Sequence, residues 1–417
     1  MPSPRRTMMG AAGAVSSGGP PYKFYTVGAD ADSRGTQAQS STAVLTSPVQ
    51  VGSGEDWVQA SGQNGGAVAT KSDGTLWGWG RIYNYDFSGN PSPNFYTSSP
   101  VQMVFNPSSL NDDDIWVNDD MDNYPTGQGV GDTGQVITKT GQLWMWNRNY
   151  EGQLPIAAAS SYNAVSPLTN ISRVGDLSDW YMGVWGGYAG SAIKTDGTLW
   201  SFGNSSSGEM GLASTSNTSR STVQVGSDTD WAWICGGSNC MFAIKTNGTL
   251  WSTGENSHAS QTWKNGQLGL GDTTNRSTLT QVGALTTWKY VTSGGGCTAA
   301  IKTDGTLWVW GGNTAFGQLG VGNTTQYSSP VQVGSLTDWK YAGIHGQQGA
   351  SMAIKTDGTL WVWGKNECSN GTTYNGILGN GSVTRDISSP VQITSPSEYW
   401  DSMGNFRFGY GLLLANP

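Results

Sequence analysis

The eight residues IKTDGTLW occur three times in this chain, at 193–200, 301–308 and 354–361, and a near copy, IKTNGTLW, occurs at 244–251. Looser copies of the same phrase contain Lys71 and Lys139. An Asp-Gly or Asn-Gly pair between two apolar runs is the strongest short signal for a β-hairpin. The phrase therefore predicts one hairpin that recurs along the chain.

The hairpin belongs to a longer repeated unit, for which residues 287–337 are one example. A tryptophan opens each unit, and a segment resembling SPVQV closes each one, so that each marker occurs seven times. The opening residues are Trp57, Trp116, Trp180, Trp231, Trp288, Trp339 and Trp400. The closing segments lie near Pro48, Pro100, Pro167, Thr222, Leu279, Pro330 and Pro390.

The lysine phrase occurs six times rather than seven, and the two ends of the chain supply the missing copy. YKFYTVG at 22–28 matches the second strand of the hairpin, and the segment 400–417 matches the first half of a unit. One unit is thus divided between the two ends. This division is expected if the N- and C-terminal strands pair and close a ring, which leaves no free sheet edge.

The predicted fold is all-β: a seven-bladed β-propeller of four-stranded antiparallel blades, closed by pairing of the N- and C-terminal strands. The 61 Gly, 20 Trp and only 12% charged residues suit short strands and tight turns rather than helices. In LWVW at 307–310 both faces of the strand are apolar, as expected for a blade covered by two neighbours. We expect residues 1–21 to form a flexible or anchoring arm and 22–417 to form a single propeller.

The combination of AIKTDGTLWVWG, GQLGVG and SSPVQV resembles the repeat of the regulator-of-chromosome-condensation family. Further copies of the middle element lie at 266–278, 208–214 and 376–382. The resemblance covers about 22–417 and implies a seven-bladed propeller. The family's namesake exchanges nucleotides on a small GTPase and binds chromatin, but the net charge of −8 argues against a nucleic-acid partner. A plant photoreceptor with this fold uses a Gly-Trp-Arg-His-Thr motif, which this chain lacks.

The sequence does not indicate an enzyme or a cofactor. It contains no P-loop, Rossmann or zinc motif, and its two histidines, His258 and His345, lie in separate insertions without a recurring catalytic partner. The acidic run at 111–123 matches no calcium-binding loop, so a solvated loop is preferred to a metal site. The cysteines, Cys235, Cys240, Cys297 and Cys368, are expected to be free and mostly buried.

Binding is expected where the chain departs from its repeat. One insertion, at 81–100, places Tyr83, Tyr85, Phe95 and Tyr96 on a predicted loop rich in Gly, Pro and Asn. A second, between Trp116 and Lys139, contains Tyr124. Exposed aromatic side chains suit contacts with proteins or sugars. The alternative is that these side chains fold back over the edge of their blade.

The N-terminal arm contains RRTMMGAAGAVSSGG and resembles the starts of structural proteins of marine tailed phages. This resemblance implies a virion component, with Arg5, Arg6, Met8 and Met9 anchoring the arm to other virion proteins and the loop insertions facing a host protein or glycan. The alternative is a cellular or secreted bacterial binding module of the inhibitor or adhesin type. The sequence has no apolar run long enough to predict a membrane span.

Overall fold

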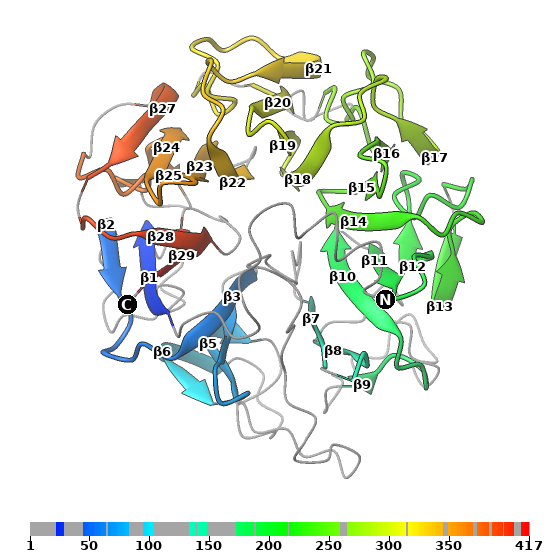
Figure 1. The fold of residues 1–417 in the computed structure, drawn as a ribbon, viewed down its shortest axis with the longest axis horizontal. Helices are drawn as coiled ribbons and strands as arrows, with labels where there is room; N and C mark the ends of the chain where they lie inside the picture. Colours follow the sequence, from blue (N-terminus) through cyan, green and yellow to red (C-terminus); the bar gives the residue numbers. More distant parts are fainter. Residues whose placement is uncertain are drawn as a thin grey trace.

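The computed structural model shows a ring of β-sheets around a central axis (Figure 1). It describes residues 22–28, 45–63, 66–82, 95–102, 133–138, 140–147, 172–186, 189–215, 217–258, 265–313, 316–344, 349–369, 373–382, 386–394, 396–403 and 410–416. All regular structure in these residues is β-strand, and none of them is helical. The all-β prediction is thereby confirmed.

Four blades each consist of four strands that follow one another in the chain and pair antiparallel with their neighbours. Every one of them begins with an opening tryptophan on its innermost strand and ends with its outermost strand. The blades are β3 (Trp57–Gln63), β4 (Gly66–Lys71), β5 (Leu76–Ile82), β6 (Phe95–Gln102); β10 (Trp180–Gly186), β11 (Ala189–Lys194), β12 (Leu199–Ser205), β13 (Asn217–Gln224); β14 (Trp231–Gly236), β15 (Cys240–Lys245), β16 (Leu250–Gly254), β17 (Arg276–Gln281); and β18 (Trp288–Gly294), β19 (Cys297–Lys302), β20 (Leu307–Gly311), β21 (Tyr327–Gln332).

A fifth blade has the same order but carries a small hairpin before its outer strand. Its strands are β22 (Trp339–Ile344), β23 (Ala350–Lys355), β24 (Leu360–Gly364) and β27 (Ile387–Ile393). The inserted hairpin pairs β25 (Glu367–Ser369) with β26 (Thr373–Asn375). The hairpin lies between Asn366 and Gly376, directly before the GILG element at 376–379, which corresponds to GQLG in the two preceding blades. Gly376 N donates to the Asn366 carbonyl as Gly266 N donates to that of Asn256, so the insertion leaves the blade itself intact.

The sixth blade closes the ring with strands from both ends of the chain. Its order is β2 (Leu45–Gln50), β1 (Lys23–Gly28), β29 (Tyr410–Ala415) and β28 (Trp400–Met403). β1 pairs with β29 along its full length, from Lys23 opposite Ala415 to Gly28 opposite Tyr410. The predicted pairing of the terminal strands is confirmed.

The seventh sheet differs from the prediction. Within the described residues it has three strands, β7 (Thr133–Ile137), β8 (Leu143–Asn147) and β9 (Ser172–Arg173). The described structure thus contains six four-stranded blades rather than the expected seven, because the residues around Trp116, expected to open this unit, lie outside the described residues. The outer strand is also displaced from the expected position: it lies at β9 and not near Pro167.

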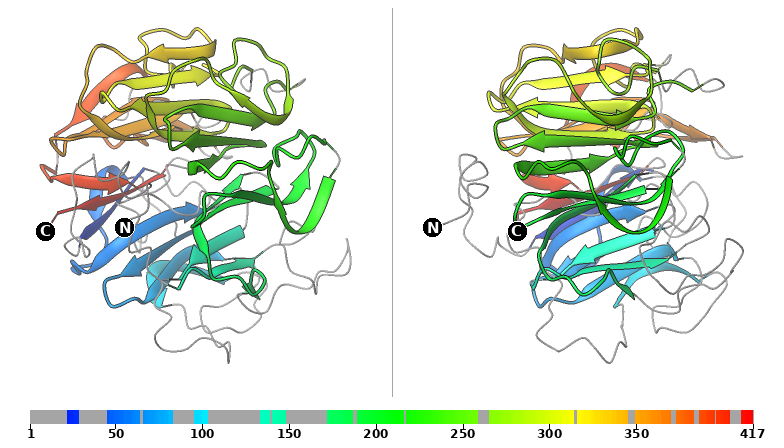
Figure 2. Two further views of the ribbon diagram at one scale, coloured as in Figure 1. Left: turned by 45° about the vertical axis from the view of Figure 1, so that its right-hand side comes forward. Right: turned by 90° about the vertical axis from the view of Figure 1, so that its right-hand side faces the viewer.

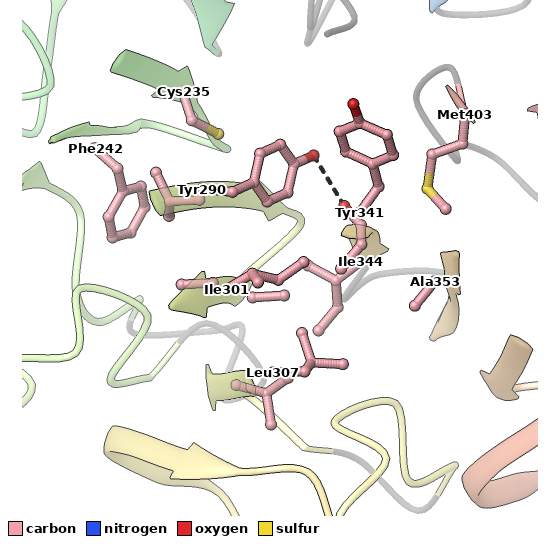
Figure 3. Packing of buried hydrophobic residues seen from close by; sticks show 14 of the residues in the cluster. Cys235, Phe242, Tyr290, Ile301, Leu307, Tyr341, Ile344, Ala353 and Met403 are labelled. Atoms are coloured by element: carbon pink, nitrogen blue, oxygen red, sulfur yellow. Dashed lines mark hydrogen bonds between the residues drawn. The ribbon is translucent and has the colours of Figure 1, made fainter. Parts of the chain in front are cut away.

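An aromatic row on the innermost strands ties neighbouring blades together. Trp233 packs against Tyr290 with ring centroids 5.4 Å apart and the rings tilted by 49°. Tyr290 meets Tyr341 edge-on at 6.1 Å (Figure 3). Each also makes a hydrogen bond to the next blade: Trp233 Nε1 donates to the carbonyl of Val291 at 3.1 Å, and Tyr290 Oη to that of Ala342 at 3.0 Å. The rings of Trp233 and Tyr290 are therefore buried while their polar atoms, Nε1 and Oη, are hydrogen-bonded.

A second set of contacts between blades is built on the GQLG element. Trp310, on β20, is fully buried, and its Nε1 donates at 2.8 Å to the carbonyl oxygen of Gln267 in the preceding blade. Gly269 has φ +74° and leaves no room for a side chain, because a Cβ there would lie 2.7 Å from Trp310 Nε1. The following blade repeats the arrangement with Trp363, Gln318 and Gly320. The repeated glycine is thus required both by its backbone angle and by the indole above it.

The strands cross the thickness of the ring, so the connecting segments gather on its two opposite faces (Figure 2). One face carries the Thr-Asp-Gly turns of the lysine phrase together with the loops that lead from each outer strand to the next opening tryptophan. We call this the clamp face, for the side-chain arrangement described below. Among the described residues there is no helix long and apolar enough to cross a membrane.

Candidate functional site

The clamp face repeats one arrangement of side chains in five blades. In each, the lysine of the repeated phrase lies over the opening tryptophan of its blade and over the tryptophan that ends the phrase, at ring-centroid distances of 3.6–5.4 Å. Such an ammonium–indole arrangement is a double cation–π interaction. We call each group a clamp and name it by its lysine: Lys71, Lys194, Lys245, Lys302 and Lys355.

A hydrogen-bond relay holds the second tryptophan of each clamp in place. In the Lys302 clamp, Trp308 Nε1 donates to Thr306 Oγ1 at 2.8 Å, and that hydroxyl donates to Asp304 Oδ1 at 2.6 Å. The other four clamps have the same relay, with Asn247 replacing the aspartate in one of them. The relay explains why the phrase is repeated so strictly: its aspartate and its second threonine position an indole ring, and its lysine lies over that ring.

The relay carboxylates are stabilised in their charged form. Hydrogen bonds from the side chain and then from the backbone of Thr306 lower the pKa of Asp304, and Thr359 lowers the pKa of Asp357 in the same way. A depressed carboxyl pKa contributes stability that is fully present above the ordinary value, about 4, and is lost as the pH falls through the folded-state value. Acid is therefore expected to weaken the turns of the clamp face.

The double variant Asp304→Asn, Asp357→Asn tests this expectation. Asn247 already accepts the same bonds, from Thr249 N at 3.0 Å and Thr249 Oγ1 at 2.8 Å, so the variant should fold and keep its relays. Its urea midpoint should decline less than that of the wild type between pH 5 and pH 3, since two shifted carboxyls no longer titrate. Parallel declines in the two proteins would contradict the assignment.

Four of the five clamps have a carboxylate beside the lysine. The aspartate that precedes the opening tryptophan pairs with the ammonium in each: Asp56 with Lys71 at 3.0 Å, Asp179 with Lys194 at 3.2 Å, Asp230 with Lys245 at 3.1 Å and Asp338 with Lys355 at 3.4 Å. A second carboxylate, Asp228, lies 2.8 Å from Lys245. Although burial opposes it, hydrogen bonds to Asp228 and Asp230 raise the pKa of Lys245.

The Lys302 clamp departs from this pattern. Thr287 stands at the aspartate position, and no ion pair to Lys302 is present among the described residues. The ammonium instead lies 3.6 Å from the centroid of Trp308, the shortest such distance in the five described clamps. Burial lowers the pKa of Lys302, and the nearby charge of Asp304 only partly opposes that shift.

Exposed apolar side chains also occur on the clamp face. Leu177, Leu285 and Leu336 are more than two fifths exposed and lie at matching positions in the loops that precede Trp180, Trp288 and Trp339. Tyr399, directly before Trp400, is 46% exposed. Four further exposed residues, Val49, Val101, Val223 and Val391, lie on the outermost strands instead. The described residues thus present exposed apolar side chains in two places: the clamp face, and the outermost strands of the blades, which we call the rim.

Most of the binding residues predicted from the sequence lie outside the described residues. These are Arg5, Arg6, Met8 and Met9 of the arm, and Tyr83, Tyr85 and Tyr124 of the insertions; the acidic run at 111–123 and His345 also lie outside. Their proposed roles stay predictions.

The prediction that Phe95 and Tyr96 lie on a loop is wrong. Both belong to β6, where Phe95 pairs with Ile82 and Tyr96 with Arg81. β5 and β6 extend further than the repeat predicts, because the β-branched and aromatic residues at the two ends of the insertion continue the strand pairing. The insertion therefore lengthens an outer hairpin before any loop begins, and the expected role of these two residues in binding stays a prediction.

The remaining polar candidates do not form a metal site among the described residues. His258 lies 4.0 Å from Glu255 Oε1 at the end of a strand, and no group of three metal-ligating side chains is present in the part of the chain that the structure describes. Cys235, Cys240 and Cys297 are buried and are not in disulfides, as predicted, whereas the side chain of Cys368 lies outside the described part of the structure. Burial raises the pKa of the Cys297 thiol to about 12, which makes it a poor nucleophile.

The clamps were not predicted as a site, although their signal is visible in the sequence. The opening tryptophan, the lysine and the closing tryptophan recur at matching positions, and the Asp before Trp57, Trp180, Trp231 and Trp339 is replaced by Thr287 before Trp288. The spacing indicates that these residues repeat. Only the strand register, which places Trp288 opposite Lys302, shows that they meet.

Comparisons with known proteins agree with the repeat and the fold. Residues 304–348 match the regulator of chromosome condensation (RCC1) repeat. The chain is 31% identical over 215 residues to the mitochondrial RCC1 domain-containing protein RUG3 of Arabidopsis thaliana, across 49% of this chain and 45% of that protein. It is 27% identical over 266 residues to the ultraviolet-B receptor UVR8 of the same plant, across 62% and 56% of the two chains. The chain thus matches about half the length of these relatives.

Among solved structures, Prp20p of Saccharomyces cerevisiae superposes with a TM-score of 0.72 at 14% identity, covering 95% of this chain and 91% of that one. At this identity the likeness concerns the fold alone. That structure was described together with the binding of Prp20p to Gsp1p and histones, so a propeller of this architecture binds proteins. The matching repeat, the two plant relatives and the shared architecture agree that this chain is similar to the RCC1 repeat proteins.

Proposed function

We propose that this protein is a non-catalytic binding module that engages a partner protein through its clamp face. The observation that carries the proposal is the presence of Leu177, Leu285, Leu336 and Tyr399, all exposed, in equivalent loops of one face. Exposed large apolar side chains that gather on one face of an otherwise polar surface are typical of a protein-binding surface.

The rim is a weaker candidate for the binding surface. Its exposed valines lie on outermost strands, and three of those strands place a proline directly before the valine: Pro48, Pro100 and Pro390. A proline cannot donate a hydrogen bond and so blocks the pairing of an edge strand with another chain. The rim therefore has the features of a protected edge, and the clamp face does not.

Site-specific photo-crosslinking in extracts of the native host cell tests the proposal. A photoreactive phenylalanine analogue is placed at Leu285 or Leu336 on the clamp face, and at Val223 or Val391 on the rim as matched exposed controls. We expect one predominant crosslinked protein from the clamp-face positions and none from the rim. Equal crosslinking from both places, or none from the clamp face, would contradict the proposal.

A narrower hypothesis is that the protein is a virion component whose arm, residues 1–21, anchors it to the capsid or tail. Its support is the short resemblance of that arm to phage structural proteins, and the relatives found by comparison add none. A cellular or secreted binding module of the inhibitor or adhesin type is the alternative. Mass spectrometry of purified phage particles distinguishes the two: peptides from residues 1–40 at stoichiometric levels support a virion protein, and their absence contradicts it.

A further inference from the structure

The Lys302 clamp is built like the others but lacks the carboxylate that the other four described clamps contain. Thr287 occupies the same backbone position as the missing aspartate: Thr303 N donates to the carbonyl of Thr287 at 2.8 Å, and the corresponding bond to the carbonyl of Asp56, Asp179, Asp230 or Asp338 is also 2.8 Å in the other clamps. The difference is therefore confined to one side chain.

The position that the carboxylate occupies in the other clamps is open to solvent. The paired side chains of Asp56, Asp179, Asp230 and Asp338 are 40–43% exposed, whereas the lysines beneath them are largely buried. An external carboxylate can therefore reach the same place above Lys302. Thr287 is itself exposed.

The surroundings of Lys302 are less acidic than those of the other clamps. Of the six described loops that lead to an opening tryptophan, the loop 282–287 has no acidic residue, and the other five have at least one. Lys289, next to Trp288, also has no ion pair among the described residues; burial and then the charge of Lys340 lower its pKa. In a chain of net charge −8, this blade thus presents two lysines without carboxylate partners.

Apolar residues border the same position on both sides. Leu285 lies in the loop that contains Thr287 and is 44% exposed. On the other side, the carbonyl of Gly305, in the turn that follows Lys302, accepts a hydrogen bond from Trp339 N at 3.1 Å, so this turn abuts the loop that carries Leu336. Leu336 is 42% exposed. A ligand at Lys302 therefore has apolar surface within reach in both directions.

We propose that the Lys302 clamp binds a carboxylate side chain of a partner protein, within a segment that also places apolar side chains against Leu285 and Leu336. This inference rests on the proposed use of the clamp face and specifies the chemistry of its partner: an acidic and apolar peptide segment. The four internal aspartates show the geometry that the incoming carboxylate adopts. Charge-assisted hydrogen bonds from a partly buried ammonium are among the stronger polar contacts at interfaces.

Fluorescence anisotropy with two labelled peptides tests the proposal. The probe is a twelve-residue peptide of alternating Asp and Leu, and its uncharged twin carries Asn in place of Asp. We expect wild-type protein to bind the acidic peptide on the order of tenfold more tightly than the twin, the preference that one charge-assisted hydrogen bond confers. Equal affinities for the two peptides, or no binding of the acidic one, would overturn the proposal.

Two variants separate the clamp from general charge effects. Thr287→Asp supplies the carboxylate internally, as in the other four clamps, and should fold normally and abolish the preference for the acidic peptide. Thr286→Asp adds the same charge one residue away, on an equally exposed threonine, and should retain most of the preference. An equal loss of the preference for the acidic peptide in both variants would show that only net charge matters. That result would refute the Lys302 clamp as the binding site.

Photo-crosslinking of these variants distinguishes a failure of the carboxylate site from a failure of the proposed function. If photo-crosslinking from Leu285 continues unchanged in Thr287→Asp, the clamp face binds its partner but the Lys302 carboxylate site is refuted. If crosslinking from Leu285 is lost in Thr287→Asp and kept in Thr286→Asp, both proposals are supported. Absence of clamp-face crosslinks in wild-type protein would refute the proposed function, while a tenfold preference for the acidic peptide would still identify the clamp as a carboxylate site.

Discussion

Replacing Trp310 by alanine is expected to destabilise the protein by about 3–5 kcal/mol, the usual range for removing a fully buried tryptophan. The indole is 0% exposed and meets Trp288 and Phe242 at ring-centroid distances of 6.1 and 6.3 Å. It also carries the hydrogen bond to the Gln267 carbonyl in the neighbouring blade. The substitution therefore leaves a cavity at the junction of two blades and removes one of the two hydrogen bonds that the Gln267 carbonyl accepts, the other coming from Thr298 Oγ1 at 3.0 Å.

Trp310→Phe separates these two effects. Phenylalanine fills most of the space but cannot donate to Gln267, whose carbonyl keeps its hydrogen bond from Thr298 Oγ1. The expected loss is therefore smaller, about 0.5–1.5 kcal/mol for one hydrogen bond. Both variants are measured by urea denaturation, followed by far-ultraviolet circular dichroism. A loss below about 1 kcal/mol for the alanine variant would contradict the central place of this indole between the blades.

Removing the last strand, β29, is expected to abolish cooperative folding. Leu413, Leu414 and Ala415 are buried, and β29 pairs with β1 on one side and with β28 on the other. A chain ending at residue 409 loses this buried surface and exposes two strand edges at once, which invites aggregation. We expect loss of the cooperative unfolding transition, measured by differential scanning calorimetry, and association measured by light scattering.

A circular permutant provides the matched control. A Thr-Asp-Gly linker joins Ala415 directly to Lys23, which hold the places of Lys302 and Thr306 in the strand register, so the linker recreates the turn found in the other blades. The chain is opened between Gly334 and Ser335 in a loop between blades. All strand pairs are then retained, and stability should stay within about 1 kcal/mol of the wild type, because only a loop connection changes. A cooperative transition in the truncated chain, or an unfolded permutant, would contradict this account of ring closure.

The repeat predicted most of the fold because each of its signals is local. The Asp-Gly turn at 304–305 and the apolar run LWVW at 307–310 determine a hairpin within a few residues. The β1–β29 pairing is the exception, since it was predicted from the unit divided between the two ends. The residues around Trp116 departed from the repeat, and the sheet there has three described strands instead of the predicted four. The outer strand near Pro167 was misplaced for the same reason, since an insertion separates it from its hairpin.

The candidate site was less predictable, because its residues meet only across strands. Lys302 and Trp288 are brought together by strand register, and the significance of Thr287 emerges only when four other clamps show an aspartate in its place. The binding residues predicted from the sequence were chosen by their departure from the repeat in length, as in the insertion at 81–100. The replacement of aspartate by Thr287 changes one side chain and leaves the length of the unit unchanged, so a search for insertions does not find it.

The pairing of β1 with β29 also determines the order in which the molecule can be completed during synthesis. β1 leaves the ribosome before the blades that lie between it and β29, so its edge stays without β29 until those blades have been synthesised. The blades between can form from local contacts as they emerge, whereas ring closure awaits a contact of very large sequence separation. The nascent chain is therefore an open arc with an unpaired edge, and chaperone binding to this edge would protect it until release.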